Sequence, residues 1–158
     1  MLKIRVINGP NLNMLGIREL EIYGRQTFED IEALLRKEAQ ALGIELDFFQ
    51  SNHEGEIIDS IHEAYMGNFD GLIINPGAYT HYSYAIRDAI SSVKIPCIEV
   101  HLSNINARDE FRRISVTAPA CIGQICGFGS DSYVAALYIL HRRLSGKNVG
   151  NSPVTKER

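Results

Sequence analysis

The sequence has no long apolar run: in 158 residues no stretch approaches the ~20 consecutive apolar residues that a membrane-spanning helix requires. The first residues of the chain include Lys3 and Arg5, and this segment is too charged and too short for a secretion signal. We therefore expect a cytoplasmic protein that has no membrane partner.

Cysteine is scarce as well, since the chain holds only Cys97, Cys121 and Cys126. An odd number cannot pair completely, and each of the three lies within an apolar stretch. Thiols in such positions usually pack in the core of an intracellular protein. The sequence thus favours reduced core cysteines over a disulfide framework.

An excess of basic charge is also absent. The 16 Lys and Arg residues oppose 19 Asp and Glu residues, which gives a net charge of −3. The basic residues are scattered along the chain instead of gathering in one segment. We therefore expect no nucleic-acid partner.

Length and composition place the chain among ordinary globular proteins. The apolar fraction of 45% and the charged fraction of 22% are near the averages for that class. A chain of 158 residues is long enough for one core and too short for two. We predict a single domain over residues 1–146, followed by a frayed polar tail over residues 147–158.

Motifs for several common chemistries are missing. The loop after the first predicted strand lacks the glycine spacing of a dinucleotide or phosphate cradle, so we expect no nucleotide or flavin cofactor. His53 and His62 have no second histidine four residues on, and the cysteines lack paired spacing, so we expect no metal. None of the five lysines falls at the carboxyl end of a predicted strand. A Schiff-base mechanism therefore has no candidate nucleophile.

Short β-rich runs alternate with longer runs of helical spacing, the pattern of βαβ units around a parallel sheet. Five strands are predicted, over residues 3–8, 44–50, 71–75, 96–101 and 121–127. Most are too apolar to have one wet face, so both faces of the sheet should be covered. This pattern favours a doubly wound sheet of the flavodoxin type, with strand order 2-1-3-4-5.

Four helices should pack on this sheet. The first has Thr27 as a candidate N-cap and Gly43 as its stop. The second spans residues 54–66 with Tyr65 among its inward side chains, and the third follows Thr80 directly. The fourth carries a stripe of apolar residues from Tyr133 to residue 144.

Ligands of such sheets bind beyond the carboxyl ends of the strands, where the winding reverses between strands one and three. The connection after strand one, residues 8–24, is unusually long and shows no regular pattern. Long connections of this kind are usually functional lids. The alternative is a surface loop whose glycines merely turn the chain.

Histidines follow two neighbouring strands. The period of two along a strand puts Glu99 and His101 on one side, where the carboxylate can hold the imidazole and help it carry a proton. His81 should lie in the first turn of the third helix, where it can hydrogen-bond a hydroxyl or an anion. The bland alternatives are a structural role for His101 and a capping role for His81.

Two arginines follow the fourth strand at a spacing of four residues. If this segment is helical, Arg108 and Arg112 lie on one helix face, and Arg113 points away. Such a pair is most often a solvated surface in the absence of other context. Its place after the strand that carries His101 makes it a candidate for the site.

Three ordered blocks of residues carry a resemblance to a known family. They are Asn8-Gly9-Pro10-Asn11-Leu12 with Leu15-Gly16, Arg18-Glu19 and Tyr23-Gly24; Asn75-Pro76-Gly77-Ala78 with Thr80-His81 and Ser83; and Glu99-Val100-His101-Leu102-Ser103-Asn104 with Ala107-Arg108 and Phe111-Arg112. With these blocks the chain resembles the type II dehydroquinases over residues 1–146. The resemblance implies dehydration of 3-dehydroquinate to 3-dehydroshikimate through an enolate, in the shikimate pathway or in quinate breakdown.

The resemblance implies a role for each residue of the catalytic set. Tyr23 is the base, Arg18 and Arg108 favour its phenolate, and His101, oriented by Glu99, protonates the departing hydroxyl. Asn11 is similar to the residue that holds a water against the enolate oxygen.

Substrate binding and assembly are implied in the same way. Asn75, His81 and Arg112 resemble the hydroxyl-binding set, and the backbone at Leu102 and Ser103 resembles the carboxylate site. Asp88 matches a residue that reaches a neighbouring subunit's site in a trimer, and four trimers commonly form a dodecamer.

One departure from the family and one alternative function stay open. Leu20 stands where the family usually has proline, which bears on the stiffness of the lid but not on its chemical groups. The competing hypothesis is a non-catalytic module of the same fold that binds a small molecule. A degenerate copy should have lost Tyr23, Arg18 or His101, and all three are present.

Overall fold

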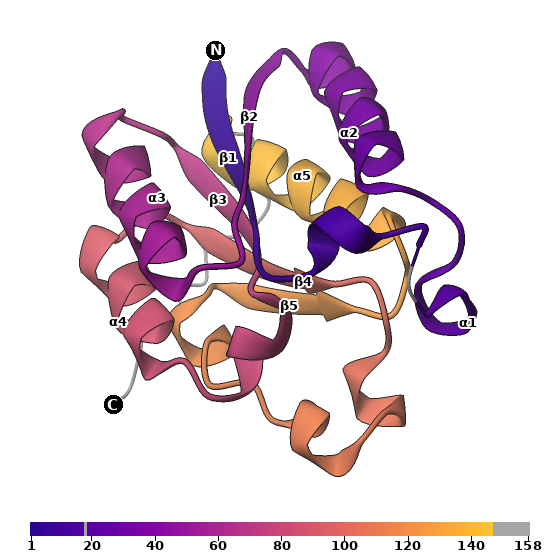
Figure 1. The fold of residues 1–158 in the computed structure, drawn as a ribbon. Coiled ribbons are helices and arrows are strands. Elements are labelled where there is room, and N and C mark those ends of the chain that lie inside the picture. Colours follow the sequence, from indigo (N-terminus) through magenta and orange to yellow (C-terminus); the bar gives the residue numbers. More distant parts are fainter. Residues whose placement is uncertain (18, 147–158) are drawn as a thin grey trace.

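The computed structural model describes residues 1–17 and 19–146, so the predicted tail, 147–158, lies outside the described residues. Five parallel strands form one sheet in the order β2-β1-β3-β4-β5 (Figure 1). They are β1 (Leu2–Asn8), β2 (Ile44–Gln50), β3 (Gly71–Asn75), β4 (Cys97–His101) and β5 (Gly123–Cys126). The predicted doubly wound, flavodoxin-like sheet is confirmed.

Helices cover both faces of this sheet in a three-layer arrangement (Figure 1). They are the short α1 (Leu20–Tyr23), α2 (Phe28–Leu42), α3 (Glu54–Met66), α4 (Tyr84–Val93) and α5 (Asp131–Leu144). Alternate residues of the central strands divide the core: Val6 and Ile73 pack with α2 and α5, whereas Ile7 and Ile74 pack with α3 and α4. None of the described helices is long and apolar enough to cross a bilayer.

Local sequence fixes the ends of α2 as predicted. The Thr27 hydroxyl accepts a hydrogen bond from the Asp30 backbone N–H at 3.1 Å, and the Asp30 carboxylate accepts one from the Thr27 N–H at 3.0 Å. This reciprocal pair satisfies two N–H groups that the helix cannot bond internally. Gly43 ends the helix with a φ of 68°, a left-handed conformation that favours glycine.

The third predicted helix begins later than expected. A 3-10 helix over Gly77–His81 follows β3, and α4 starts only at Tyr84 because the Ser83 hydroxyl caps it by accepting the Ile86 N–H at 3.1 Å. His81 is therefore the last residue of the 3-10 helix, and it does not lie in the first turn of α4. The prediction was wrong because the apolar spacing of α4 does not mark which residue before it supplies the cap.

One further expectation about burial was wrong, and two hold only in part. Tyr65 of α3 is 58% exposed, and the buried stripe of that helix continues through Ala64 instead. Helices cover both faces of the sheet as predicted, but residues of the edge strands β2 and β5 are largely half-buried or exposed. Cys97 is buried, whereas Cys121 and Cys126 are only partly buried.

The long connection after β1 has more structure than the sequence indicated. It contains a 3-10 helix over Leu12–Met14 and the four-residue helix α1, which buries none of its residues. Arg18 lies between them, outside the described residues. α1 thus carries Tyr23 on a short, largely exposed element above the sheet.

Candidate active site

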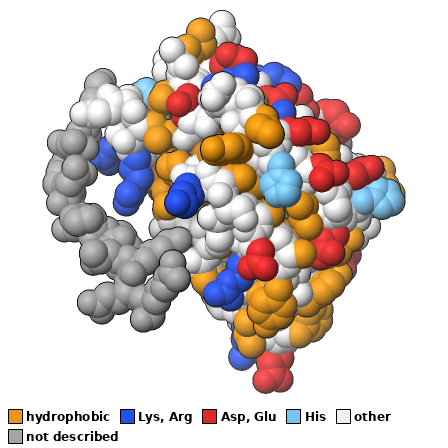
Figure 2. All heavy atoms as spheres, turned by 90° about the vertical axis from the view of Figure 1, so that its left-hand side faces the viewer, with side chains coloured by type: hydrophobic (Ala, Val, Ile, Leu, Met, Phe, Trp, Pro, Cys, Tyr) orange, Lys and Arg blue, Asp and Glu red, His pale blue; other side chains and the backbone are white. Residues whose placement is uncertain are grey.

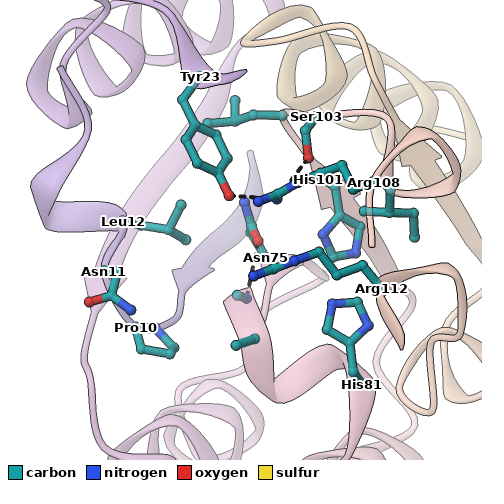
Figure 3. Close-up of a pocket in the computed structure, with 14 residues that line it drawn as sticks. Pro10, Asn11, Leu12, Tyr23, Asn75, His81, His101, Ser103, Arg108 and Arg112 are labelled. Atoms are coloured by element: carbon teal, nitrogen blue, oxygen red, sulfur yellow. Dashed lines mark hydrogen bonds between the residues drawn. The ribbon is translucent and has the colours of Figure 1, made fainter. Parts of the chain in front are cut away.

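A pocket of about 110 Å³ opens beyond the carboxyl ends of β1, β3 and β4. The segments that follow these three strands supply most of its walls, and α1 adds one side chain (Figure 3). Its lining consists of Pro10, Asn11, Leu12, Tyr23, Asn75, Gly77, Ala78, His81, His101, Leu102, Ser103, Ile105, Arg108 and Arg112. The predicted edge of the sheet therefore holds the pocket.

The Tyr23 hydroxyl points to the Arg108 guanidinium across the pocket wall (Figure 3). Arg108 Nη1 donates to Tyr23 Oη at 2.6 Å and to Ser103 Oγ at 3.4 Å. The guanidinium carbon also lies 5.2 Å from the centre of the tyrosine ring, within range of a cation–π contact. A phenol in this position has a positive charge directly beside its oxygen.

His101 ends β4 and is held from below by Glu99. The two residues are 6% and 0% exposed, and His101 Nε2 lies 3.0 Å from Glu99 Oε2. Alternation along the strand predicted this pair, and its contact is confirmed. Since Nε2 faces Glu99, Nδ1 is the nitrogen left to exchange a proton with a ligand.

Three further side chains donate hydrogen bonds to the Glu99 carboxylate. Ser115 Oγ and Gln124 Nε2 bond Oε2 at 2.8 and 2.6 Å, and the Thr117 hydroxyl bonds Oε1. Burial raises the pKa of Glu99, but the hydrogen bonds from His101, Thr117 and Ser115 outweigh it and hold the pKa below its usual value. Glu99 is therefore a buried anion that can stabilise a protonated His101.

His81 and Arg112 form another part of the wall. Burial lowers the pKa of His81, which favours its neutral form, although a hydrogen bond to the Ile114 carbonyl opposes the shift. His81 Nδ1 donates to that carbonyl at 2.8 Å, so Nε2 of the neutral ring is an acceptor. Arg112 Nε donates to Asp109 Oδ2 at 3.4 Å. The pair offers a ligand one acceptor and one cation.

Two asparagines also line the pocket. Asn11 adopts a left-handed conformation with a φ of 67°, and its backbone N–H donates to Asn52 Oδ1 at 3.0 Å. The Asn75 amide donates to the Tyr133 hydroxyl at 3.0 Å and accepts the Gly77 N–H at 3.2 Å. Both side chains are presented by segments that other residues hold in place.

The pocket collects nine of the predicted site residues, and two other described ones do not line it. The nine are Asn11, Tyr23, Asn75, His81, His101, Leu102, Ser103, Arg108 and Arg112. Glu99 lies beneath His101, Asp88 lies exposed on α4 away from this chain's pocket, and Arg18 is outside the described residues.

The two arginines reach the pocket by a different route from the one expected. Arg108 follows a 3-10 helix over Ile105–Ala107, and Arg112 belongs to another over Glu110–Arg113. The segment is thus not one helix, and a spacing of four does not by itself place both side chains on one face. Both line the pocket because the chain turns between them.

Sequence patterns did not predict most of the residues that lie behind the pocket. Ser115 and Thr117 come from a connection without regular spacing, so no pattern pointed to them. Gln124 pairs with Glu99 in the β4–β5 register, a signal that a correct alignment of the two strands would have supplied. Tyr133 was expected only as a core residue. Over residues 1–17 and 19–146, no group of three or more His, Cys, Asp or Glu could hold a metal ion.

Comparison with known proteins identifies relatives of the whole described domain. The family model described as dehydroquinase class II matches residues 2–141. A 3-dehydroquinate dehydratase of Caldicellulosiruptor bescii is 66% identical over 140 residues, covering 89% of this chain and 97% of its own. One of Clostridium beijerinckii is 59% identical over 146 residues, covering 92% of this chain and 100% of its own.

The chain is also similar in fold to solved structures of type II dehydroquinases. A type II dehydroquinase from Butyrivibrio crossotus superimposes with a TM-score of 0.87 at 57% identity, covering 88% of this chain and 97% of its own. One from Propionibacterium acnes does so with a TM-score of 0.86 at 42% identity, covering 89% of this chain and 97% of its own. The chain belongs to the class II dehydroquinase family.

Proposed function

We propose that this protein is a hydro-lyase that dehydrates 3-dehydroquinate to 3-dehydroshikimate by anti elimination through an enolate. The observation that carries the proposal is the pairing of Tyr23 with Arg108 and of His101 with Glu99 around one pocket. A relative that is 66% identical bears the name 3-dehydroquinate dehydratase. The reaction would serve the shikimate pathway or quinate breakdown, in the cytoplasm and without a cofactor.

The first step removes a proton from the carbon beside the substrate ketone. Tyr23 takes this proton as a phenolate, and the bond electrons move onto the ketone oxygen to give an enolate. Arg108 lies 2.6 Å from the phenol oxygen, and a cation there favours the ionised form. We assign the same task to Arg18 on the family resemblance, and to Asn11 the holding of a water against the enolate oxygen.

The second step expels the hydroxyl on the next carbon. The enolate electrons re-form the ketone and create the carbon–carbon double bond, while His101 gives its proton to the departing oxygen. Water leaves, and the two proton transfers balance. Glu99, buried beside His101, stabilises the imidazolium before the transfer.

Binding of the substrate uses the remaining polar walls. We assign the ring hydroxyls to Asn75, His81 and Arg112, and the carboxylate to the backbone at Leu102 and Ser103. All five residues line the pocket around Tyr23 and His101. The assignment places donors and a cation around a substrate that is rich in hydroxyls and carries one negative charge.

We further propose that the chain forms trimers, four of which assemble into a dodecamer, with Asp88 of one subunit reaching the site of the next. Asp88 lies on the exposed face of α4. Exposed hydrophobic side chains on and next to α3 and α4, among them Met66 and Tyr84, support an interface on this side of the molecule (Figure 2). Sedimentation of an active monomer at micromolar concentration would contradict the trimer.

A direct test follows the ultraviolet absorbance after 3-dehydroquinate is added to the purified protein. The product is a conjugated enone, so we expect absorbance to rise at a rate proportional to protein concentration. A protein that binds quinate, the analogue with a hydroxyl in place of the ketone, but produces no absorbance change would instead be a non-catalytic binding module.

A further inference from the structure

A buried hydroxyl joins the carboxyl ends of β1 and β3. Tyr133, in the first turn of α5, is 2% exposed and packs in the core beneath the pocket. Its hydroxyl donates to Asn8 Oδ1 at 2.5 Å and accepts from Asn75 Nδ2 at 3.0 Å. Asn8 and Asn75 are register partners on adjacent strands, and they are 2% and 3% exposed. One side chain of α5 therefore links the two strands at which the sheet reverses its winding.

The donor and the acceptor of each hydrogen bond among Asn75, Tyr133 and Asn8 can be assigned in only one way. Asn75 Oδ1 accepts the Gly77 N–H at 3.2 Å, and a flipped amide would set its NH₂ group against that donor. Asn75 Nδ2 must therefore donate to Tyr133, and the single proton of the Tyr133 hydroxyl must go to Asn8. Burial raises the pKa of Tyr133 far above its usual value, despite the opposing bond from Asn75, so this proton stays in place at neutral pH.

Asn75 connects this hydrogen-bonded group to the pocket, because Asn75 also lines the pocket wall. With one N–H bonded to Tyr133 and one lone pair bonded to Gly77, the amide keeps one N–H and one lone pair for a ligand. We propose that Tyr133 is a positioning residue for substrate binding, which fixes the Asn75 amide so that it meets a substrate hydroxyl with a preset donor and acceptor. This inference rests on the proposed function and extends it to a residue that does not line the pocket.

The test compares two tyrosines of the same helix. Tyr133→Phe removes the linking hydroxyl, and Tyr138→Phe is the matched control, since its exposed hydroxyl donates to Glu38 at 2.8 Å. We expect Tyr133→Phe to raise KM for 3-dehydroquinate about tenfold and to keep kcat within roughly twofold, because the lost contact binds substrate and transition state alike. Tyr138→Phe should change neither constant.

A double mutant shows whether Tyr133 acts through Asn75. In an Asn75→Ala background, Tyr133→Phe should raise KM no further, because the side chain that it positions is already gone. Effects on KM that multiply in the double mutant would overturn the proposal. An unchanged KM with a lower melting temperature, or a fall in kcat alone, would overturn it as well.

Side-chain amide NMR signals separate this inference from the proposed reaction, because they require no substrate. The Asn75 pair is assigned by its disappearance in Asn75→Ala. We expect these signals to shift, and their protons to exchange faster with water, in Tyr133→Phe but not in Tyr138→Phe. A wild-type protein without turnover would overturn the proposed function alone, whereas unchanged Asn75 signals in Tyr133→Phe would overturn the positioning role in either case.

Discussion

The acid and base sides of the pocket are built in opposite ways. His101 ends a central strand, and the Glu99 beneath it is fully buried among three other donors. Tyr23 stands on a four-residue helix that has no fully buried residue, and its half-buried ring packs against the outside of the core. Its partner Arg108 comes from a connection between two 3-10 helices. The acid side is thus part of the core, whereas the base side is assembled on top of it. Changes at the acid side should alter stability and activity together, and changes at the base side should alter activity alone.

Tyr23→Phe should have the largest effect on activity and almost none on stability. The variant loses the proposed base, so we expect turnover to fall by about 10³-fold or more, near the upper range for one acid–base group. Its melting temperature should stay close to that of the parent, because phenylalanine keeps the half-buried ring that packs against the core and only the hydroxyl is lost. Turnover is measured with 3-dehydroquinate as substrate, and the melting temperature is measured by thermal unfolding.

Controls for this variant come from the chain itself. Tyr82→Phe alters a 60% exposed tyrosine away from the pocket lining and should leave turnover unchanged. Borohydride added with substrate should not inactivate the parent, since no lysine among residues 1–17 and 19–146 lines the pocket. Substantial activity in Tyr23→Phe, or a lysine trapped by borohydride, would rule out the tyrosine base.

His101→Ala should come next, with a fall in turnover of roughly 10²-fold or more, the scale for a positioned acid. It should also lower the melting temperature, because Glu99 then remains as a buried carboxylate without its main partner. A fall in both turnover and melting temperature in this one variant would distinguish the acid side from the base side. Near-normal turnover would mean that another group protonates the leaving hydroxyl.

This contrast also explains what could be predicted from sequence. The bounds of β2, β3 and α3 and the caps of α2 follow from local patterns, and the structure confirms them. The contact of Glu99 with His101 was predictable because alternation along a strand is a local rule as well.

The parts that local patterns could not supply depend on distant segments. Tyr23 and Arg108 are 85 residues apart in the chain, and their pairing was expected only from the family resemblance. The start of α4 depends on which side chain caps it, and apolar spacing does not record that choice. Periodicity predicted that Tyr133 is buried, but it cannot predict which residue accepts the hydrogen bond of a buried hydroxyl.

Arg108→Gln tests the base side without removing the base. Arg108 is the cation hydrogen-bonded to the proposed base, so its loss should lower turnover at neutral pH by roughly tenfold. Arg113→Gln is the matched control, because Arg113 is exposed and does not line the pocket. Unchanged turnover in Arg108→Gln would mean that this arginine does not assist the proposed base.

Glu99→Gln tests the acid side in the same manner, with a smaller effect on turnover than His101→Ala. The folded-state pKa of Glu99 is lowered, so its charge contributes stability above the ordinary glutamate pKa of about 4.3, and this is lost as the pH falls through the lowered value. The variant should therefore melt below the parent at neutral pH, and the gap should narrow below about pH 4. A gap that stays constant as the pH falls would contradict the buried anion.

Leu20→Pro should have the smallest effect, because it changes only the entry to α1. Leu20 is the first residue of that helix, a position where the fixed φ of proline fits and its missing N–H is not needed. Proline also disfavours the left-handed conformation of the preceding Glu19, whose φ is 42°, but an extended Glu19 is the less strained alternative. We therefore expect turnover within about threefold of the parent and an unchanged melting temperature.

Leu20→Ala is the control for this variant, because it removes the same side chain without restricting the backbone. A large loss of turnover in Leu20→Pro but not in Leu20→Ala would show that Tyr23 depends on the left-handed turn at Glu19.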